Sequence, residues 1–188
     1  CSMSYELLNI DYDPYLALQC IQDQNFTIEE QEDDHFIDYA RINDKELKTY
    51  IRQLLDLPFP IEVLFFVNPP HGVYNPHVDL QRKCAINFPV NVAGDLYTAK
   101  DAEHSYWEEN KILGEGEINY PPIDDSNRHM YEHVYFMKHP ILLDTSKPHS
   151  AANNTKISRF IITCSIFTHT FDQVKDILQE KNMIINTV

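Results

Sequence analysis

The segment 158–167, Ser-Arg-Phe-Ile-Ile-Thr-Cys-Ser-Ile-Phe, constrains the fold most. β-Branched and aromatic residues fill it, and these residue types favour strands. Shorter apolar runs with turn-forming residues beside them lie at 61–67, 85–91, 134–137 and 141–143, and each has the length of a buried strand. The chain is therefore predicted to be mainly β.

Two amphipathic segments predict helices that flank the strands. Residues 44–56 carry apolar side chains at helical spacing, with Asn43 as the expected N-cap and Pro58 beyond the end. Residues 171–181 have an apolar face of their own. We expect a single α+β domain over 1–188, divided into a mixed N-terminal region, a β core and a C-terminal helix, at 1–58, 60–167 and 171–181.

The net charge limits the classes of molecule that the chain is expected to bind. The chain has 29 acidic and 15 basic residues and a formal net charge of −14, so it repels nucleic acid and anionic lipid, and we expect it to bind neither. No apolar run is long enough for a spanning helix, and no signal peptide is recognisable. The oligomeric state stays open.

Four cysteines, at positions 1, 20, 84 and 164, form no metal-binding or disulfide pattern. Cys84 and Cys164 lie in apolar stretches, where a reduced cysteine acts as a small hydrophobic residue. We therefore expect a cytoplasmic location.

Residues 92–133 form a polar stretch that contains the only tryptophan, Trp107. The stretch is too long for a plain connection, and loops of this length are usually functional or disordered. Its role stays open in the sequence.

Four residues suggest chemistry. His77 and Asp79 are two positions apart, so on an extended segment their side chains leave the same face. His149 could supply a third ligand from another strand, and two histidines with a carboxylate suit an open iron(II) site. Arg159 follows His149 by ten residues, inside an apolar strand where an unpaired charge is costly. A bound dicarboxylate or a salt bridge would offset that cost.

Other histidines offer alternatives to this set. With nine His and 29 acidic residues, about one His-x-Asp or His-x-Glu pair is expected by chance. His139 could replace His149, although no basic residue follows it by ten positions. His129 and His133 could bind a metal on one helix face, and we interpret them as surface residues.

The segment 75–79, leading into 85–90, resembles the first metal-binding segment of the iron(II)/2-oxoglutarate-dependent oxygenases. Residues 142–149, followed by 159–162, resemble the second. The Asp-x-Ser-x-x-His pattern that ends at His149 is similar to the aspartyl/asparaginyl β-hydroxylase branch, which commonly lacks a carboxylate ligand such as Asp79. The resemblance covers residues 60–167.

The resemblance implies a double-stranded β-helix, the cupin-like jelly roll. It also implies that His77, Asp79 and His149 bind Fe(II), and that Arg159 and Asn87 bind 2-oxoglutarate. The implied activity is a dioxygenase that hydroxylates or otherwise oxidises a small molecule or a protein side chain and releases succinate and carbon dioxide.

Substrate contacts and rival functions are less defined. Candidate substrate-binding residues flank the predicted site or lie in the polar stretch: Tyr74, Arg82, Trp107 and Arg128. One rival is a non-catalytic cupin-like binding or structural module, in which His77 and His149 lie far apart. Another is a metal-dependent enzyme that does not use 2-oxoglutarate.

Overall fold

The structure, a computed structural model, describes residues 4–29, 38–92, 94–100, 111–113, 117–136 and 138–185. Two antiparallel sheets form the molecule. The seven-stranded sheet has the order β1-β11-β6-β13-β4-β3-β2, with strands Tyr5–Leu7 (β1), Ile141–Leu143 (β11), Cys84–Pro89 (β6), Arg159–Ile166 (β13), Glu62–Asn68 (β4), Asp38–Ile42 (β3) and Phe26–Glu29 (β2). The six-stranded sheet has the order β10-β7-β12-β5-β9-β8, with strands Tyr131–Phe136 (β10), Gly94–Ala99 (β7), His149–Ala152 (β12), Val73–Asp79 (β5), Glu117–Asn119 (β9) and Lys111–Leu113 (β8).

From β4 onward the chain passes repeatedly between the two sheets. β4, β6, β11 and β13 lie together in the larger sheet, while β5, β7, β10 and β12 lie together in the smaller one. This alternation is the double-stranded β-helix, or jelly roll. The predicted fold class is confirmed.

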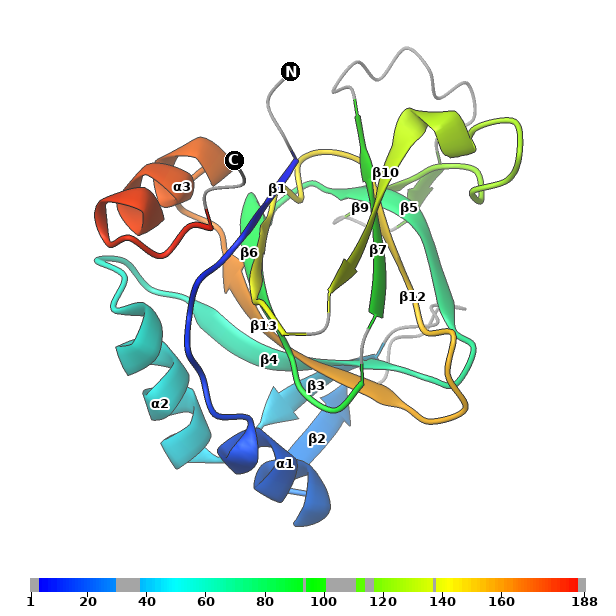
Figure 1. The fold of residues 1–188 in the computed structure, drawn as a ribbon. Coiled ribbons are helices and arrows are strands. Elements are labelled where there is room, and N and C mark those ends of the chain that lie inside the picture. The colour runs from blue at the N-terminus through cyan, green and yellow to red at the C-terminus, as the bar shows by residue number, and fades with distance from the viewer. Residues whose placement is uncertain are drawn as a thin grey trace.

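Three helices cover the outer face of the larger sheet (Figure 1). They are Tyr15–Gln22 (α1), Lys45–Leu55 (α2) and Phe171–Glu180 (α3). The main apolar cluster packs between these helices and alternate residues of β4, β6 and β13, such as Phe65, Phe88 and Ile162. Much of the hydrophobic core therefore lies outside the β-helix, and polar side chains can occupy its interior.

One sequence prediction about local structure needs correction. Asp44, not Asn43, caps α2, because its carboxylate accepts hydrogen bonds from the backbone N–H groups of Glu46 and Leu47. The polar stretch 92–133, which is too long for a plain connection, contains β7, β8, β9 and the start of β10.

The N-terminal region supplies β1, β2 and β3, which extend the larger sheet on both sides. Cys84 and Cys164 are free and buried, and burial raises the pKa of the Cys84 thiol to about 12. No helix among the described residues is long and apolar enough to cross a bilayer.

Candidate metal centre

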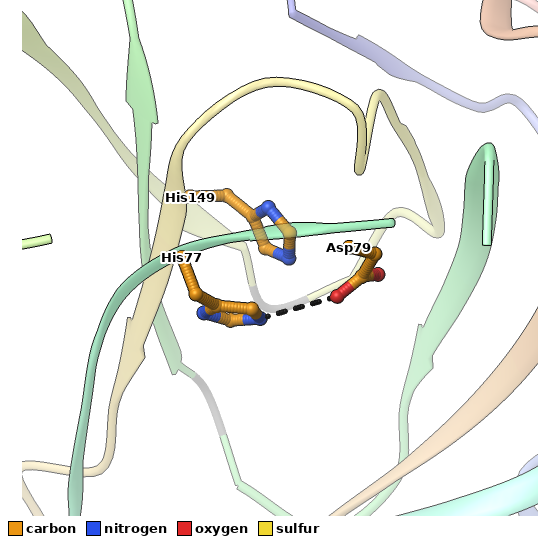
Figure 2. A group of neighbouring side chains, drawn as sticks. All are labelled: His77, Asp79 and His149. Atoms are coloured by element: carbon orange, nitrogen blue, oxygen red, sulfur yellow. Dashed lines mark ion pairs between the residues drawn. The ribbon is translucent and has the colours of Figure 1, made fainter. Parts of the chain in front are cut away.

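Three side chains converge inside the β-helix. His77 and Asp79 lie on β5, and His149 lies on the neighbouring strand β12, directly opposite His77. One ligand atom from each of the three lies within 4.8 Å of the others. Figure 2 shows both imidazoles and the carboxylate turned toward a common region. The described residues contain no second group of this kind.

Backbone carbonyls orient both imidazole rings. Nδ1 of His77 lies 3.0 Å from the carbonyl oxygen of Asn75, and Nδ1 of His149 lies 2.9 Å from that of Lys147. A carbonyl oxygen only accepts, so each Nδ1 carries the proton and each Nε2 keeps a lone pair. Such outer hydrogen bonds are typical of metal-binding histidines.

An irregularity in β5 brings His77 to its position. The pairing of β5 with β12 shifts between His149 and Ala151, so that Asn75 and Pro76 oppose a single residue. Proline cannot donate a ladder hydrogen bond and therefore suits such a bulge. Bulges commonly redirect a side chain next to a functional site.

Arg82 holds the carboxylate of Asp79. Its Nε donates to Oδ2 of Asp79 at 2.6 Å, while the other oxygen, Oδ1, lies 3.5 Å from Nε2 of His77. Both side chains of the pair are buried. Burial raises the pKa of Asp79, but Arg82 and the two histidines outweigh it and lower the pKa overall. Oδ1 thus remains for a metal, and the carboxylate stays charged.

His77 is neutral in this arrangement. Burial, together with His149, holds the pKa of His77 well below its usual value. A neutral imidazole is the form that binds a metal.

A turn before β12 connects the two metal-binding segments. The carboxylate of Asp144 accepts from the backbone N–H and the hydroxyl of Ser146, and this turn presents the Lys147 carbonyl to His149. The backbone N–H of Asp79 donates to the carbonyl of Thr145 at 2.9 Å. The Asp-x-Ser-x-x-His pattern therefore has a structural role, which is to fix the third ligand relative to the first two.

A cavity extends from these ligands through the interior of the β-helix. The atom-free space in and around it is about 620 Å³, which includes solvent at its open mouth. Its lining includes His77, His149 and Arg159. The Arg159 side chain is 1% exposed and donates from Nη1 to the carbonyl of Ala152 at 3.0 Å. Burial lowers the pKa of Arg159 to about 10, so the guanidinium stays positively charged at neutral pH.

Gly94 makes room for the guanidinium. A Cβ atom at Gly94 would lie 1.7 Å from Cζ of Arg159. Arg159 therefore crosses from β13 to rest on the backbone of β7, and no larger residue at position 94 would permit this position.

Several buried polar atoms in the interior have no hydrogen-bond partner among the described residues. Oδ1 of Asn87 and Oγ1 of Thr163 belong to residues directly opposite each other on β6 and β13. The amide of Asn68 and Oγ1 of Thr98 are in the same condition. Buried polar groups are normally hydrogen-bonded, so the interior is suited to a polar ligand. The donor set fits a metal ion, and the cradle around Arg159 together with these atoms fits a polar, negatively charged ligand.

The remaining predicted site residues divide into two groups. Tyr74, Arg82 and Asn87 line the cavity, with the Tyr74 ring edge-on to His77 at a centroid distance of 4.1 Å. Arg128 is exposed on the short 3-10 helix Arg128–Met130 (η2), outside the cavity lining. Trp107 lies outside the described residues. Their roles in substrate binding stay predictions.

The alternative ligands lie elsewhere. His139 is exposed. His129 lies on η2 and His133 on β10, so they share no helix face. His133 instead contacts Asp95 on the outer side of the smaller sheet.

Sequence reasoning missed most residues that surround the site, among them Asn68, Gly94 and Thr98. Asn68 directly follows the predicted strand 61–67, and counting alternate positions one residue further along that strand would have placed it inside. Gly94 is one of only four glycines, which is a weak signal of a close approach. Thr98 carried no signal.

The fold and the cluster together define a jelly-roll protein with a candidate metal centre. No protein-family profile matches the chain, and no curated protein matches its sequence. Among solved structures, the chain is similar to a Trichoplax adhaerens prolyl hydroxylase in complex with a hypoxia-inducible factor peptide. Identity is 12% over 93% of this chain and 86% of that one, with a TM-score of 0.49.

Two further similarities are of the same kind. The Drosophila melanogaster CENP-C cupin domain is 9% identical over 83% of this chain and 99% of its own, with a TM-score of 0.43. Lactobacillus farciminis oxalate decarboxylase is 9% identical over 79% of this chain and 33% of its own, with a TM-score of 0.43. At these identities the likeness concerns fold alone, and nothing about this chain's activity follows from it.

Proposed function

We propose that the protein is an iron(II)- and 2-oxoglutarate-dependent oxygenase. It would hydroxylate or otherwise oxidise a small molecule or a protein side chain, with release of succinate and carbon dioxide. The observation that carries this proposal is one cavity lined by His77 and His149, two members of the candidate ligand cluster with Asp79, and by the buried, charged Arg159.

The donor set favours iron(II). Imidazole nitrogens and one carboxylate, with the remaining coordination positions open, are the ligands of non-haem iron oxygenases. Nε2 of His77, Nε2 of His149 and Oδ1 of Asp79 would hold the ion. Arg82 keeps the second oxygen of Asp79 in a hydrogen bond, which favours coordination through one oxygen.

Arg159 favours a dicarboxylate as the co-substrate. A guanidinium binds a carboxylate through charge-assisted hydrogen bonds, and this one is positioned by Gly94 and by the Ala152 carbonyl. Asn87 would add a contact midway along the cavity. The bound iron and 2-oxoglutarate would supply the oxidising chemistry, while the protein orients both and excludes water.

The two rival functions predict different interiors. A non-catalytic module predicted that the histidines lie far apart, whereas the ring centroids of His77 and His149 are 4.2 Å apart. A metal-dependent enzyme without 2-oxoglutarate needs no carboxylate-binding group in its cavity, so the presence of a buried guanidinium in the cavity lining favours the co-substrate.

Succinate release and ferrous ion binding test the proposal. The protein is incubated with Fe(II), 2-oxoglutarate and oxygen, and succinate is quantified with and without candidate substrates. We expect slow succinate formation even without substrate, abolished in His77→Ala through loss of the metal and in Arg159→Ala through loss of the co-substrate.

His129→Ala is the matched control, since His129 is exposed and outside the cavity lining. Absence of ferrous ion binding by the wild type would refute the proposal. Iron binding that 2-oxoglutarate leaves unchanged, in wild type and Arg159→Ala alike, would favour the metal enzyme without this co-substrate.

A further inference from the structure

Asn68, the last residue of β4, is a polar side chain without a partner at the Arg159 end of the cavity. It is 1% exposed and lines the cavity. Neither its Nδ2 nor its Oδ1 has a hydrogen-bond partner among the described residues. A primary amide in this condition is costly unless a ligand supplies the missing bonds.

Hydrogen bonds fix the backbone around Asn68, and they thereby fix the position of its side-chain amide in the cavity wall. Nδ2 of Asn153 donates to the carbonyls of Asn68 and Pro69 at 3.0 and 2.9 Å. The backbone N–H of Gly72 donates to the Pro69 carbonyl and closes a turn. A Cβ atom at Gly72 would lie 2.3 Å from Oδ1 of Asn68, so the glycine leaves the space that the amide occupies.

Strand register places Asn68 beside the buried charge. Asn68 on β4 pairs directly with Arg159 on β13, and both side chains face the interior. The metal ligands lie at the other end, since His149 pairs with Thr98 while the guanidinium rests on Gly94. Gly94 and Thr98 are four residues apart on β7, roughly 13 Å of extended strand. Asn68 is therefore remote from the metal and adjacent to the cation.

We propose that Asn68 binds the distal carboxylate of the co-substrate together with Arg159, with Nδ2 donating to one carboxylate oxygen. This inference rests on the proposed function. It assigns a residue to the end of the ligand that distinguishes a dicarboxylate from a 2-oxo acid with a single carboxylate. A carboxylate has about four acceptor positions, so it can accept from the amide and the guanidinium at once.

Two ligands that differ only at the distal end test this assignment. Dissociation constants for 2-oxoglutarate and for 2-oxopentanoate are measured by titration calorimetry on Mn²⁺-loaded protein. In Asn68→Ala we expect 2-oxoglutarate to bind roughly tenfold or more weakly, the loss of a hydrogen bond to a charged group. Binding of 2-oxopentanoate should change less than about threefold, because it lacks the carboxylate that Asn68 would bind.

Asn68→Asp is the near-isosteric second variant. Its carboxylate would repel the ligand and pair with Arg159, so 2-oxoglutarate binding should be lost while Mn²⁺ and 2-oxopentanoate still bind. Asn43→Ala, at an exposed asparagine outside the cavity lining, should match the wild type for both acids.

The outcomes distinguish a failure of the proposed role of Asn68 from a failure of the proposed function. Equal weakening of both acids in Asn68→Ala, or no weakening of either, would overturn the role of Asn68, and loss of 2-oxoglutarate binding in Arg159→Ala would leave the proposed function intact. If Arg159→Ala binds each of the two acids as tightly as the wild type does, the proposed function fails, and the role of Asn68 fails with it.

Discussion

Replacing Arg82 with methionine should destabilise the metal-free protein strongly. The guanidinium of Arg82 pairs with Asp79 at 2.6 Å, and both residues are 7% exposed. Removing one member of a buried ion pair typically costs about 3–5 kcal/mol, because the other charge stays buried without compensation. Methionine keeps much of the apolar stem of Arg82 and removes its guanidinium, including the contact of Cζ with the Phe66 ring at 5.2 Å from the centroid, so most of the loss reports the missing charge.

The loss of stability in Arg82→Met has an upper limit, because Asp79 can take up a proton and avoid an unpaired buried charge. Starting from the usual pKa of 3.8, holding the carboxyl protonated at pH 7 costs about 4.4 kcal/mol, at 1.36 kcal/mol for each pH unit. We therefore expect Arg82→Met to lower the free energy of unfolding by about 3–4 kcal/mol. For a chain of this length, that corresponds to a decrease in Tm on the order of 10 °C.

A bound metal ion should restore much of this loss. The cation replaces the guanidinium as the partner of Asp79, so saturating Mn²⁺ should raise the unfolding free energy more in Arg82→Met than in the wild type. Urea unfolding in chelator and in Mn²⁺ measures both quantities. The double variant Asp79→Asn/Arg82→Met, with neither charge, should be more stable than Arg82→Met alone. Arg41→Met, in an exposed ion pair, is the control and should change stability by less than about 1 kcal/mol.

A loss below about 1 kcal/mol in Arg82→Met, or the same loss in the Asp79→Asn background, would refute the reasoning. Either result would mean that the Asp79 charge is not balanced by Arg82 in the folded protein.

Three further changes test other parts of the structure. Below about pH 6.5 the unfolded chain binds a proton at His77, whereas burial keeps His77 neutral in the folded chain. As the pH is lowered, His77 should therefore decrease the unfolding free energy of the metal-free protein by up to about 1.4 kcal/mol per pH unit. His77→Asn should flatten that slope in urea unfolding and His129→Asn should not; equal slopes would contradict the buried neutral form. Gly94→Ala should displace the Arg159 guanidinium and abolish 2-oxoglutarate binding in calorimetry, and retention of both Mn²⁺ and 2-oxoglutarate binding would count against the cradle. Phe88→Ala, fully buried beneath the helices, should lower the unfolding free energy by about 3–5 kcal/mol, and a loss under 1 kcal/mol would mean that the outer core is not the principal one.

The sequence predicted the larger sheet better than the smaller one, for a physical reason. Strands β4, β6, β11 and β13 present apolar residues to the helices or to one another, so hydrophobic pattern marks them. Strand β11 was predicted at its observed bounds, 141–143.

The smaller sheet gave weaker signals. β12 reads His-Ser-Ala-Ala and β7 begins with Gly-Asp, sequences without β-branched or aromatic runs. These strands lie between the cavity on one side and a small outer cluster on the other. Propensity scales describe a half-buried apolar surface and so miss strands of this kind.

The main hydrophobic core lies outside the β-helix, and this explains why the sequence indicated the metal ligands and Arg159 but not most of the residues around them. The four residues first singled out were recognisable by type and spacing. Asn68, Gly94 and the bond between Arg82 and Asp79 depend on strand register and side-chain direction, which a one-residue shift would reverse. Because the main apolar core lies between the helices and the outer face of the larger sheet, polar side chains occupy the interior of the β-helix, and these need hydrogen-bond partners. The residues that complete the site are therefore polar or small, types that hydrophobic patterning assigns to turns and surfaces.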